Sequence, residues 1–284
     1  MADGPHASAG TGASAAPGAS SRPVPADTPG RVFITGASSG IGAALARRYA
    51  AQGAVVGLVG RRREALQALL DALPGQDHRM YVLDVRDRAA LQAAAGDFLT
   101  GGPVDRVIAS AGISAGTLTE APEDFAVFQA IFDTNVLAMV ATFEPFIASM
   151  RARRRGILVG IGSVAGVRGL PGAGAYSASK AAVRAYCESL RVELRGSGVQ
   201  VVTLAPGFIA TPMTAHNPYR MPFLMPVERF ARRAVRAIES GDRYRVIPWP
   251  MAWVGRLLRL VPDALYDAVA SRRKRKPRIG EGAP

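Results

Sequence analysis

Short apolar runs alternate with longer amphipathic segments along most of the chain. Runs of about four to eight mostly apolar residues predict buried strands, and longer segments with apolar residues every three or four positions predict helices. The longest helices are expected over Phe125–Arg153 and Ala175–Arg195. This alternation predicts one α/β domain, doubly wound around a mostly parallel, seven-stranded central sheet. The predicted strands lie near Arg31, Val55, Met80, Val104, Ile157, Val199 and Arg245.

The same pattern sets the ends of the domain. Its apolar periodicity covers residues 31–248, and a chain of 284 residues with 49% apolar content can bury one sizeable core. Residues 1–30 are mostly Ala, Gly, Ser and Pro, so we expect disorder there. We expect a C-terminal helical extension over 249–270, with a second short helix at Asp263–Ala270, and then a basic disordered tail over 271–284.

No segment has the pattern typical of export or membrane insertion. The first 30 residues contain no continuous apolar run of about seven or more residues, so we expect no signal peptide. We also expect no membrane-spanning helix, because no stretch approaches about 20 apolar residues. These patterns predict a cytoplasmic protein.

The sequence TGASSGIG, residues 35–42, follows the first predicted strand and leads into a helix expected over Ile41–Gln52. Glycines there permit a tight turn and leave no Cβ between the backbone and a pyrophosphate at the positive helix N-terminus. A glycine-spaced turn alone also fits a flexible connection. Because a second predicted strand, Val55–Val59, follows the helix, the arrangement predicts a dinucleotide-binding turn.

The end of the second strand favours NADP over NAD. An acidic side chain there would hydrogen-bond the adenosine ribose, whereas this chain has Gly60 followed by Arg61, Arg62 and Arg63. A guanidinium binds a 2′-phosphate in bidentate fashion, and an uncompensated carboxylate repels it. Arg61 carries most of this inference, because Arg62 and Arg63 fit equally well the solvent-facing start of the next helix.

The basic residues single out one lysine. Only three of the 35 basic residues are lysines, and Lys180, the only one outside the C-terminal tail, lies four residues after Tyr176. On a helix this spacing puts both side chains on one face. An adjacent ammonium stabilises a phenolate and lowers the tyrosine pKa, so Tyr176 is a candidate proton donor. Such a pair also occurs by chance on solvated helix faces.

Together these features resemble the short-chain dehydrogenase/reductase family, over residues 31 to about 248. The resemblance implies a Rossmann domain and catalytic roles for Asn135, Ser163, Tyr176 and Lys180. With Arg61 included, the predicted cofactor-binding residues are Gly36, Ser38, Ser39, Gly40, Ile41, Gly42, Arg61, Asp84, Val85, Ala111, Gly112, Tyr176, Lys180, Pro206, Gly207 and Thr211.

The chain departs from the family pattern at the end of the fourth strand. Where the family usually has an asparagine-rich segment, this chain has Ser110 between two alanines. A serine reaches less far than an amide, so the bracing of the central strands is an open question. Each catalytic assignment also has a plain alternative: Ser163 as a turn residue, Asn135 as a helix cap, and Tyr176 as a packed aromatic.

The residues and the resemblance imply reduction of a carbonyl compound with NADPH. Tyr176 gives its proton to the developing alkoxide, and Ser163 hydrogen-bonds that oxygen. Lys180 lowers the phenol pKa and, by resemblance, holds the nicotinamide ribose, while Asn135 positions a water that connects Lys180 with solvent. The mostly apolar segment Phe208–Pro226 favours an apolar or acyl-like carbonyl compound over a free sugar.

Two other functions stay open. One is a catalytically idle NADP-binding sensor or scaffold whose basic tail docks a partner. The other is a membrane-surface lipid reductase that contacts the bilayer through 249–278, since Trp249, Trp253, Leu257 and Leu260 share a rough helical face near several arginines. Packing of this face on the domain, or over the pocket of a neighbouring subunit, is the alternative.

Partners and metals are less well defined by the sequence. The resemblance implies a homodimer or homotetramer that pairs the two longest helices. Part of the net charge of +13 lies in the basic tail. A solvated tail is favoured over one that binds nucleic acid, so we do not expect a nucleic-acid partner. We predict no metal site, because His6, His78 and His216 lack ligand spacing, and Cys187 has no cysteine with which to form an intrachain disulfide.

Overall fold

Seven strands form one central sheet, as the sequence predicted. The computed structural model describes residues 1, 30–215, 217–272 and 275–278, so most of the segment expected to be disordered lies outside the described residues. All neighbouring strands of the sheet are parallel, in the order β3-β2-β1-β4-β5-β6-β9. The strands are β1 (Arg31–Thr35), β2 (Val55–Gly60), β3 (Arg79–Val82), β4 (Arg106–Ala109), β5 (Gly156–Ile161), β6 (Val199–Pro206) and β9 (Tyr244–Ile247).

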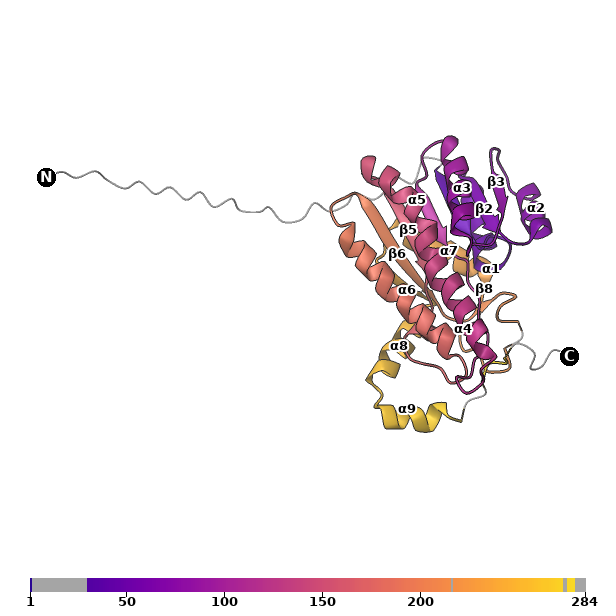
Figure 1. The fold of residues 1–284 in the computed structure, drawn as a ribbon, viewed down its shortest axis with the longest axis vertical. Coiled ribbons are helices and arrows are strands. Elements are labelled where there is room, and N and C mark those ends of the chain that lie inside the picture. Colours follow the sequence, from indigo (N-terminus) through magenta and orange to yellow (C-terminus); the bar gives the residue numbers. More distant parts are fainter. Residues whose placement is uncertain (2–29, 216, 273–274, 279–284) are drawn as a thin grey trace.

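Helices cover both faces of this sheet (Figure 1). Because the central strands β4 and β5 are covered on both sides, their residues are buried throughout, which explains their continuous apolar sequence. One face carries α1 (Gly40–Ala50), α2 (Arg63–Asp71) and α7 (Val227–Glu239), and the other carries α3 (Arg88–Thr100), α5 (Ala138–Ala152) and α6 (Gly174–Glu193).

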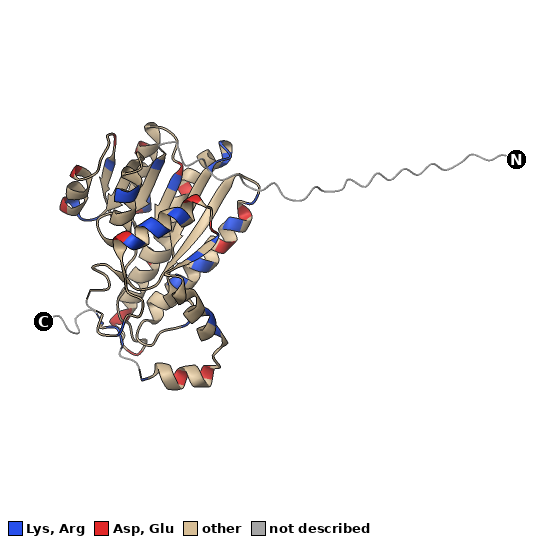
Figure 2. Cartoon of the chain, turned by 180° about the vertical axis from the view of Figure 1, so that it is seen from behind, with Lys and Arg blue, Asp and Glu red and all other residues tan. Residues whose placement is uncertain are grey.

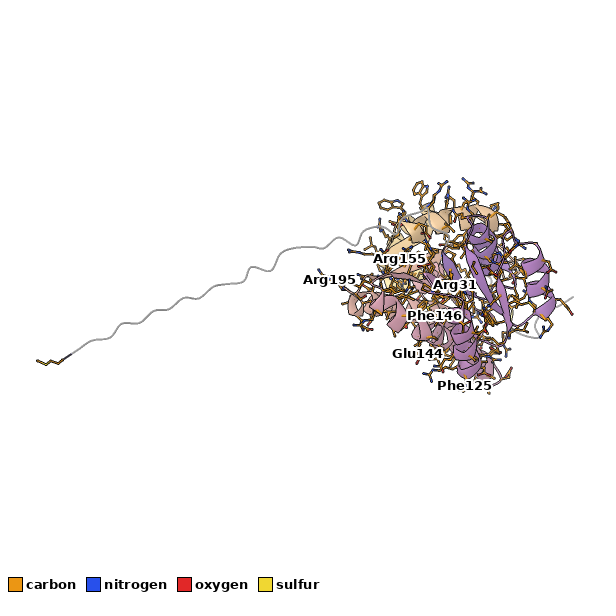
Figure 3. The ribbon with its side chains drawn as sticks, turned by 90° about the horizontal axis from the view of Figure 1, so that it is seen from above. Arg31, Phe125, Glu144, Phe146, Arg155 and Arg195 are labelled. Atoms are coloured by element: carbon orange, nitrogen blue, oxygen red, sulfur yellow. The ribbon has the colours of Figure 1, made fainter. Side chains whose placement is uncertain are left out.

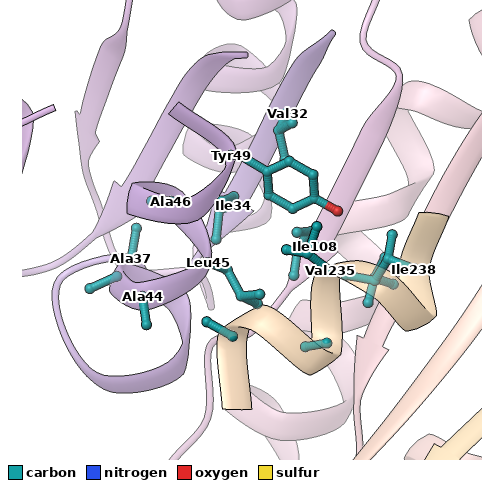
Figure 4. Packing of buried hydrophobic residues seen from close by; sticks show 14 of the residues in the cluster. Val32, Ile34, Ala37, Ala44, Leu45, Ala46, Tyr49, Ile108, Val235 and Ile238 are labelled. Atoms are coloured by element: carbon teal, nitrogen blue, oxygen red, sulfur yellow. The ribbon is translucent and has the colours of Figure 1, made fainter. Parts of the chain in front are cut away.

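Helices α1 and α7 pack together on β1 and fix the position of the glycine turn. Figure 4 shows Leu45 and Tyr49 of α1 beside Val235 and Ile238 of α7, all buried against the sheet. The Tyr49 hydroxyl donates to Glu239 Oε1 at 2.9 Å. The same carboxylate accepts from the buried guanidinium of Arg106 on β4. This polar contact ties the C-terminal ends of α1 and α7 to the sheet.

A long helical stretch runs from Asp124 to Ala152 and comprises α4 (Asp124–Phe132), a π-helical turn (Asp133–Leu137) and α5. By length and hydropathy it could cross a membrane, which corrects the expectation that no stretch is apolar enough. Phe146 of α5 nevertheless lies in the core and Phe125 of α4 lies at the surface, as Figure 3 shows. Removing α5 from the sheet would expose that core, so we interpret this stretch as a core helix.

Two helices follow the last strand and lie beyond the carboxyl ends of the sheet (Figure 1). They are α8 (Pro250–Leu260) and α9 (Asp263–Ala270). Arg168, in the loop after β5, donates to the carbonyl oxygens of Leu258 and Val261 at 3.0 and 2.9 Å. Its guanidinium also pairs with Asp263 at 2.8 Å. One partly buried arginine therefore holds the connection between the two helices against the β5 loop.

Residues 275–278 lie in contact with the domain. This contact differs from the expectation of a disordered tail over 271–284. Among the described residues of 271–284, Arg278 forms a β-bridge with Gly116, and the Gly116 N–H donates to the Pro277 carbonyl at 2.9 Å. Arg278 also pairs with Glu123 and Asp124. Basic residues are spread over the strands and helices of the domain as well (Figure 2), so the positive charge is not confined to this segment.

Candidate active site

A cleft lies at the carboxyl ends of the strands, where the strand order reverses between β1 and β4. In doubly wound sheets this position leaves a crevice, because the connections on the two sides run over opposite faces. Every predicted cofactor-binding residue lines this cleft, and so do Ser163, Tyr176 and Lys180. Of the predicted catalytic residues, Asn135 is absent from the lining and lies fully buried behind it.

In the glycine turn after β1, backbone segments approach each other so closely that a side chain would not fit between them. Gly36 has φ +70, and a Cβ there would lie 2.7 Å from the Ala111 backbone. A Cβ on Gly42 would overlap the Gly36 carbonyl oxygen. Ser39 precedes α1 in an extended conformation and makes no side-chain cap, so the first N–H groups of α1 keep their hydrogen-bonding capacity for a ligand.

Two arginines lie at the end of β2, beside the glycine turn. The Arg62 guanidinium donates to the carbonyl oxygen and the hydroxyl of Ser38 at 3.1 and 3.3 Å. Arg61 is mostly exposed, and its nearest carboxylate, Asp84, is 4.0 Å away. The pKa of Asp84 is lowered, chiefly because Arg86 hydrogen-bonds it. Arg62, which the sequence pattern did not favour over Arg63, lines the cleft as Arg61 does.

Ser163 and Tyr176 bring two hydroxyl groups together. Ser163 follows β5, and its Oγ accepts from the Ala165 N–H at 3.1 Å, which begins a short 3-10 helix at Val164–Gly166. Tyr176 lies in the first turn of α6. Burial raises the pKa of Tyr176, and a hydrogen bond with the Ser163 side chain opposes that rise. The pair can therefore present two hydroxyl donors to one oxygen atom of a ligand.

Lys180 lies one turn further along α6 and is 5% exposed. Its ammonium donates to the Ile161 carbonyl at 2.8 Å and lies 5.8 Å from the centre of the Tyr176 ring. Burial lowers the pKa of Lys180 to about 8. The lowering of the Tyr176 pKa by Lys180 stays a prediction: the ammonium is engaged by a backbone carbonyl, and burial is the largest influence on the phenol.

Asn135 braces the site rather than lining it. It lies in the π-helical turn between α4 and α5, a type of interruption that often occurs at functional sites. Its Oδ1 accepts from the Ile113 N–H, and its Nδ2 donates to the Ile113 carbonyl and to Ser179 Oγ. The Ser179 hydroxyl in turn donates to the Tyr176 carbonyl at 2.8 Å. Asn135 thus connects the loop after β4 with the helix of Tyr176.

The cleft also includes residues that were not among the predicted site residues. At Ser110, the departure from the family pattern, the chain is braced from β1, because the Ala111 N–H donates to Thr35 Oγ1 at 3.5 Å.

Thr214 accepts from the Thr211 N–H and donates to the Ile209 carbonyl, which folds the segment after β6 over the cleft. His216 lies outside the described residues. The additional lining residues include Arg62, Ser110, Ile113, Thr134, Ile161, Gly162, Ile209, Pro212, Met213 and Thr214.

Comparisons with known proteins identify the family of this chain. Residues 31–220 match the short chain dehydrogenase family. An uncharacterized oxidoreductase of Myxococcus xanthus is 40% identical over 242 residues, which cover 84% of this chain and 95% of that protein. A sulfoacetaldehyde reductase of Chromohalobacter salexigens is 37% identical over 186 residues, covering 64% and 74%. A crystal structure of a short-chain dehydrogenase from Streptomyces avermitilis has a TM-score of 0.72 at 24% identity, covering 86% and 98%.

The chain therefore belongs to the short-chain dehydrogenase family and is an oxidoreductase. Members of this family bind a nicotinamide cofactor, NAD or NADP. The residues present fit such a group, because the cradle at Gly36 and Gly42 would be filled by any Cβ and the N-terminus of α1 lacks a side-chain cap. The roles of the individual side chains stay predictions, and so does the absence of a metal site.

Proposed function

We propose that this protein is an NADPH-dependent reductase that converts a ketone or aldehyde to an alcohol. The observation that carries the proposal is the convergence of Ser163, Tyr176 and Lys180 at one side of a cleft whose other side is the glycine turn. Two hydroxyl groups beside a buried ammonium are suited to protonating an oxygen that becomes negatively charged.

The turn at Gly36–Gly42 would hold a nicotinamide dinucleotide, which when bound would supply the hydride that the carbonyl carbon receives. The Tyr176 hydroxyl donates its proton to the carbonyl oxygen, and the Ser163 hydroxyl hydrogen-bonds the same oxygen and stabilises its charge. Because the pKa of Lys180 is lowered to about 8, its ammonium can return a proton to the phenolate near neutral pH. In the opposite direction the same groups would accept a proton from an alcohol.

Asn135 contributes by holding the helix of Tyr176 in place. Both of its amide hydrogens are engaged by Ile113 and Ser179. Its Oδ1 has one lone pair beyond the bond from the Ile113 N–H, and that lone pair is the only acceptor it could offer to a water path towards Lys180. We propose a positioning role for Asn135, with the water path as a secondary role.

Arg61 and Arg62 support a preference for NADP. Both guanidinium groups line the cleft at the end of β2, and Arg62 also contacts the turn at Ser38. The end of β2 carries no carboxylate that would select the ribose of NAD, and Asp84 is already held by Arg86. A 2′-phosphate would therefore meet two positive groups there.

A screen with the purified protein tests the proposed reaction. We expect consumption of NADPH with at least one ketone or aldehyde from a panel that includes apolar and anionic compounds. Tight binding of NADPH without consumption of it by any member of the panel would favour the sensor or scaffold instead. The panel includes acyl-like compounds, because the segment after β6 exposes apolar side chains at Met213, Phe223 and Leu224.

A peripheral membrane reductase is a second candidate, favoured by the apolar surface of α8 and α9. Arg256 and Arg259 lie on α8, so this surface has basic residues suited to anionic headgroups. In liposome sedimentation with anionic lipid, the double variant Trp253→Ser, Leu257→Asp should lose binding and keep turnover of soluble carbonyls. Unchanged sedimentation would contradict this proposal. The side chains that expose more than half of their surface are Trp249, Trp253, Leu257, Leu260, Leu265 and Val269.

We also propose a cytoplasmic homo-oligomer. Exposed apolar side chains on the α4–α5 stretch, Phe125, Phe128, Leu137 and Val140, support burial of this face by a second copy. Sedimentation velocity should give a dimer or a larger species for the native chain, and Phe128→Arg should shift it towards the monomer. A native chain that sediments as a monomer at micromolar concentration would contradict the proposal.

A further inference from the structure

The C-terminal segment Arg275–Arg278 reaches the proposed proton donor from a distant part of the sequence. Lys276 donates to Ser114 Oγ at 2.7 Å, although the two residues are 162 positions apart. Its ammonium lies 5.9 Å from the centre of the Tyr176 ring, nearly the same distance as the ammonium of Lys180. Two of the three lysines in the chain therefore lie beside Tyr176.

Contacts on both sides hold this segment in place. After Lys276, the Pro277 carbonyl accepts from the Gly116 N–H, and Arg278 pairs with Glu123 and Asp124. Before it, α8 and α9 are fixed to the loop after β5 by Arg168 and by the Tyr266 hydroxyl, which donates to the Gly169 carbonyl. The position of Lys276 thus follows from ordered contacts of its neighbours.

The charge of Lys276 is not compensated within the part of the chain that the structure describes. Among the described residues no carboxylate forms an ion pair with Lys276: Glu123 and Asp124 pair with Arg278, Asp263 pairs with Arg168, and the contact of Lys276 is a neutral hydroxyl. Burial lowers the pKa of Lys276, and no carboxylate among the described residues raises it. A half-buried cation without a counterion is stabilised by any anion that reaches it.

The loop that holds Lys276 also borders the cleft. Ser114 follows Ile113, which lines the cleft and is fixed by Asn135. Tyr176 lines the cleft as well, whereas Ser114 and Lys276 are not among its lining residues, so Lys276 is connected with the cleft through Ser114 and the Tyr176 ring. An arginine would carry the same charge, yet the chain, which uses arginine almost everywhere else, has the more compact ammonium here.

We propose that Lys276 is a specificity-determining residue that binds an anionic group, a carboxylate or a sulfonate, on the carbonyl substrate. The substrate class is then an oxo acid, in which the carbonyl is reduced at Tyr176 while the anionic group contacts the C-terminal segment. This assignment rests on the proposed reductase activity, and it adds to that activity the chemical feature that the substrate must carry.

Matched substrates and matched variants test the proposal in the full-length protein. The substrates are 4-oxobutanoate and its methyl ester, which differ in the anionic group alone. Lys276→Gln removes the ammonium, Lys276→Arg keeps the charge, and Arg272→Gln removes an exposed charge from the same end of the chain. All four proteins are assayed for NADPH consumption, and their melting temperatures are compared.

The native protein should prefer the anionic substrate. Lys276→Gln should lower kcat/KM for 4-oxobutanoate by about 10- to 100-fold, mainly through KM, as expected for loss of a charge-assisted hydrogen bond. Turnover of the methyl ester should change by less than about threefold. Lys276→Arg should restore part of the loss, and Arg272→Gln should behave as the native protein. Equal effects of Lys276→Gln on both substrates would overturn the proposal and leave the reductase activity intact.

A binding measurement decides the case in which neither compound is reduced. Titration calorimetry with 4-hydroxybutanoate is performed on protein saturated with NADPH, so that no turnover occurs. Binding to the native protein that Lys276→Gln abolishes would support the anion site even if the reductase activity failed. Equal binding to both proteins, or binding to neither, would overturn it.

Discussion

The two sides of the cleft are built in different ways. The cofactor side is made by a contiguous turn, Gly36–Gly42, and by the end of the next strand, so neighbouring residues determine its shape. The proposed substrate side brings together the start of α6, which lines the cleft at Tyr176, with the loop at Ser114–Thr117 and the C-terminal segment around Lys276, which lie next to it. This difference shows why the cofactor side can be recognised from a short motif, while the substrate side depends on the whole fold.

The largest effect is expected at Tyr176, where loss of the proton donor should slow the reaction without weakening cofactor binding. Tyr176→Phe removes the hydroxyl and keeps the ring, so kcat should fall by about 10²- to 10⁴-fold, the range typical of a lost general acid. Affinity for NADPH, measured by fluorescence titration, should change by less than about twofold. Tyr244→Phe, on the edge strand β9, is the matched control and should keep full activity. Substantial turnover by the Tyr176 variant would mean that another group supplies the proton.

The second prediction addresses the cofactor side alone. Gly36 has a left-handed backbone conformation, and Gly36→Ala places a Cβ only 2.7 Å from the Ala111 backbone. It should cost about 1–3 kcal/mol in the free energy of unfolding and lower NADPH affinity at least tenfold. Gly96→Ala in α3, where a Cβ meets nothing within 4 Å, should instead stabilise the protein by about 0.5–1 kcal/mol. Urea unfolding measures both, and equal effects would contradict the close packing of the turn.

The third prediction concerns Lys180, which lies between the two sides. Its pKa is lowered to about 8 by burial, whereas an unfolded lysine titrates near 10.5. Between these values the unfolded chain binds more protons, so this residue makes the folded state more stable as pH rises from about 8 to 10.5. Below pH 8 the full cost of the buried ammonium, about 3 kcal/mol, is present.

A comparison with Lys180→Met isolates that contribution. The variant should be more stable than the native protein at pH 7, and the difference should shrink as pH approaches 10.5. Other groups that titrate nearby, such as Tyr186 with a pKa raised to about 12, are present in both proteins and largely cancel. A stability difference that does not depend on pH would show that the ammonium is not desolvated as the structure indicates.

Much of the fold and part of the site could be predicted from the sequence, for physical reasons that particular residues illustrate. Continuous apolar runs such as that of β5 gave the sheet, since only covered parallel strands are apolar on both faces. Contacts between distant segments were not predictable. The hydrogen bond from Lys276 to Ser114 and the brace from Asn135 to Ser179 depend on how loops close in three dimensions. The engagement of Lys180 by the Ile161 carbonyl also follows from tertiary packing.

The smallest expected effect distinguishes the two arginines of the cofactor side. The sequence pattern favoured Arg61, whereas Arg62 contacts the glycine turn through Ser38. If both meet the 2′-phosphate, Arg61→Ala and Arg62→Ala should each weaken NADPH about tenfold or more relative to NADH, while Arg63→Ala, at the start of α2, should change neither. Dissociation constants for both cofactors measure this. Equal losses of NADPH and NADH in the Arg62 variant would assign Arg62 to shaping the turn, because removing its bond to Ser38 would then disturb the pyrophosphate position common to both cofactors. A selective loss confined to Arg61 would leave the phosphate to that exposed side chain alone.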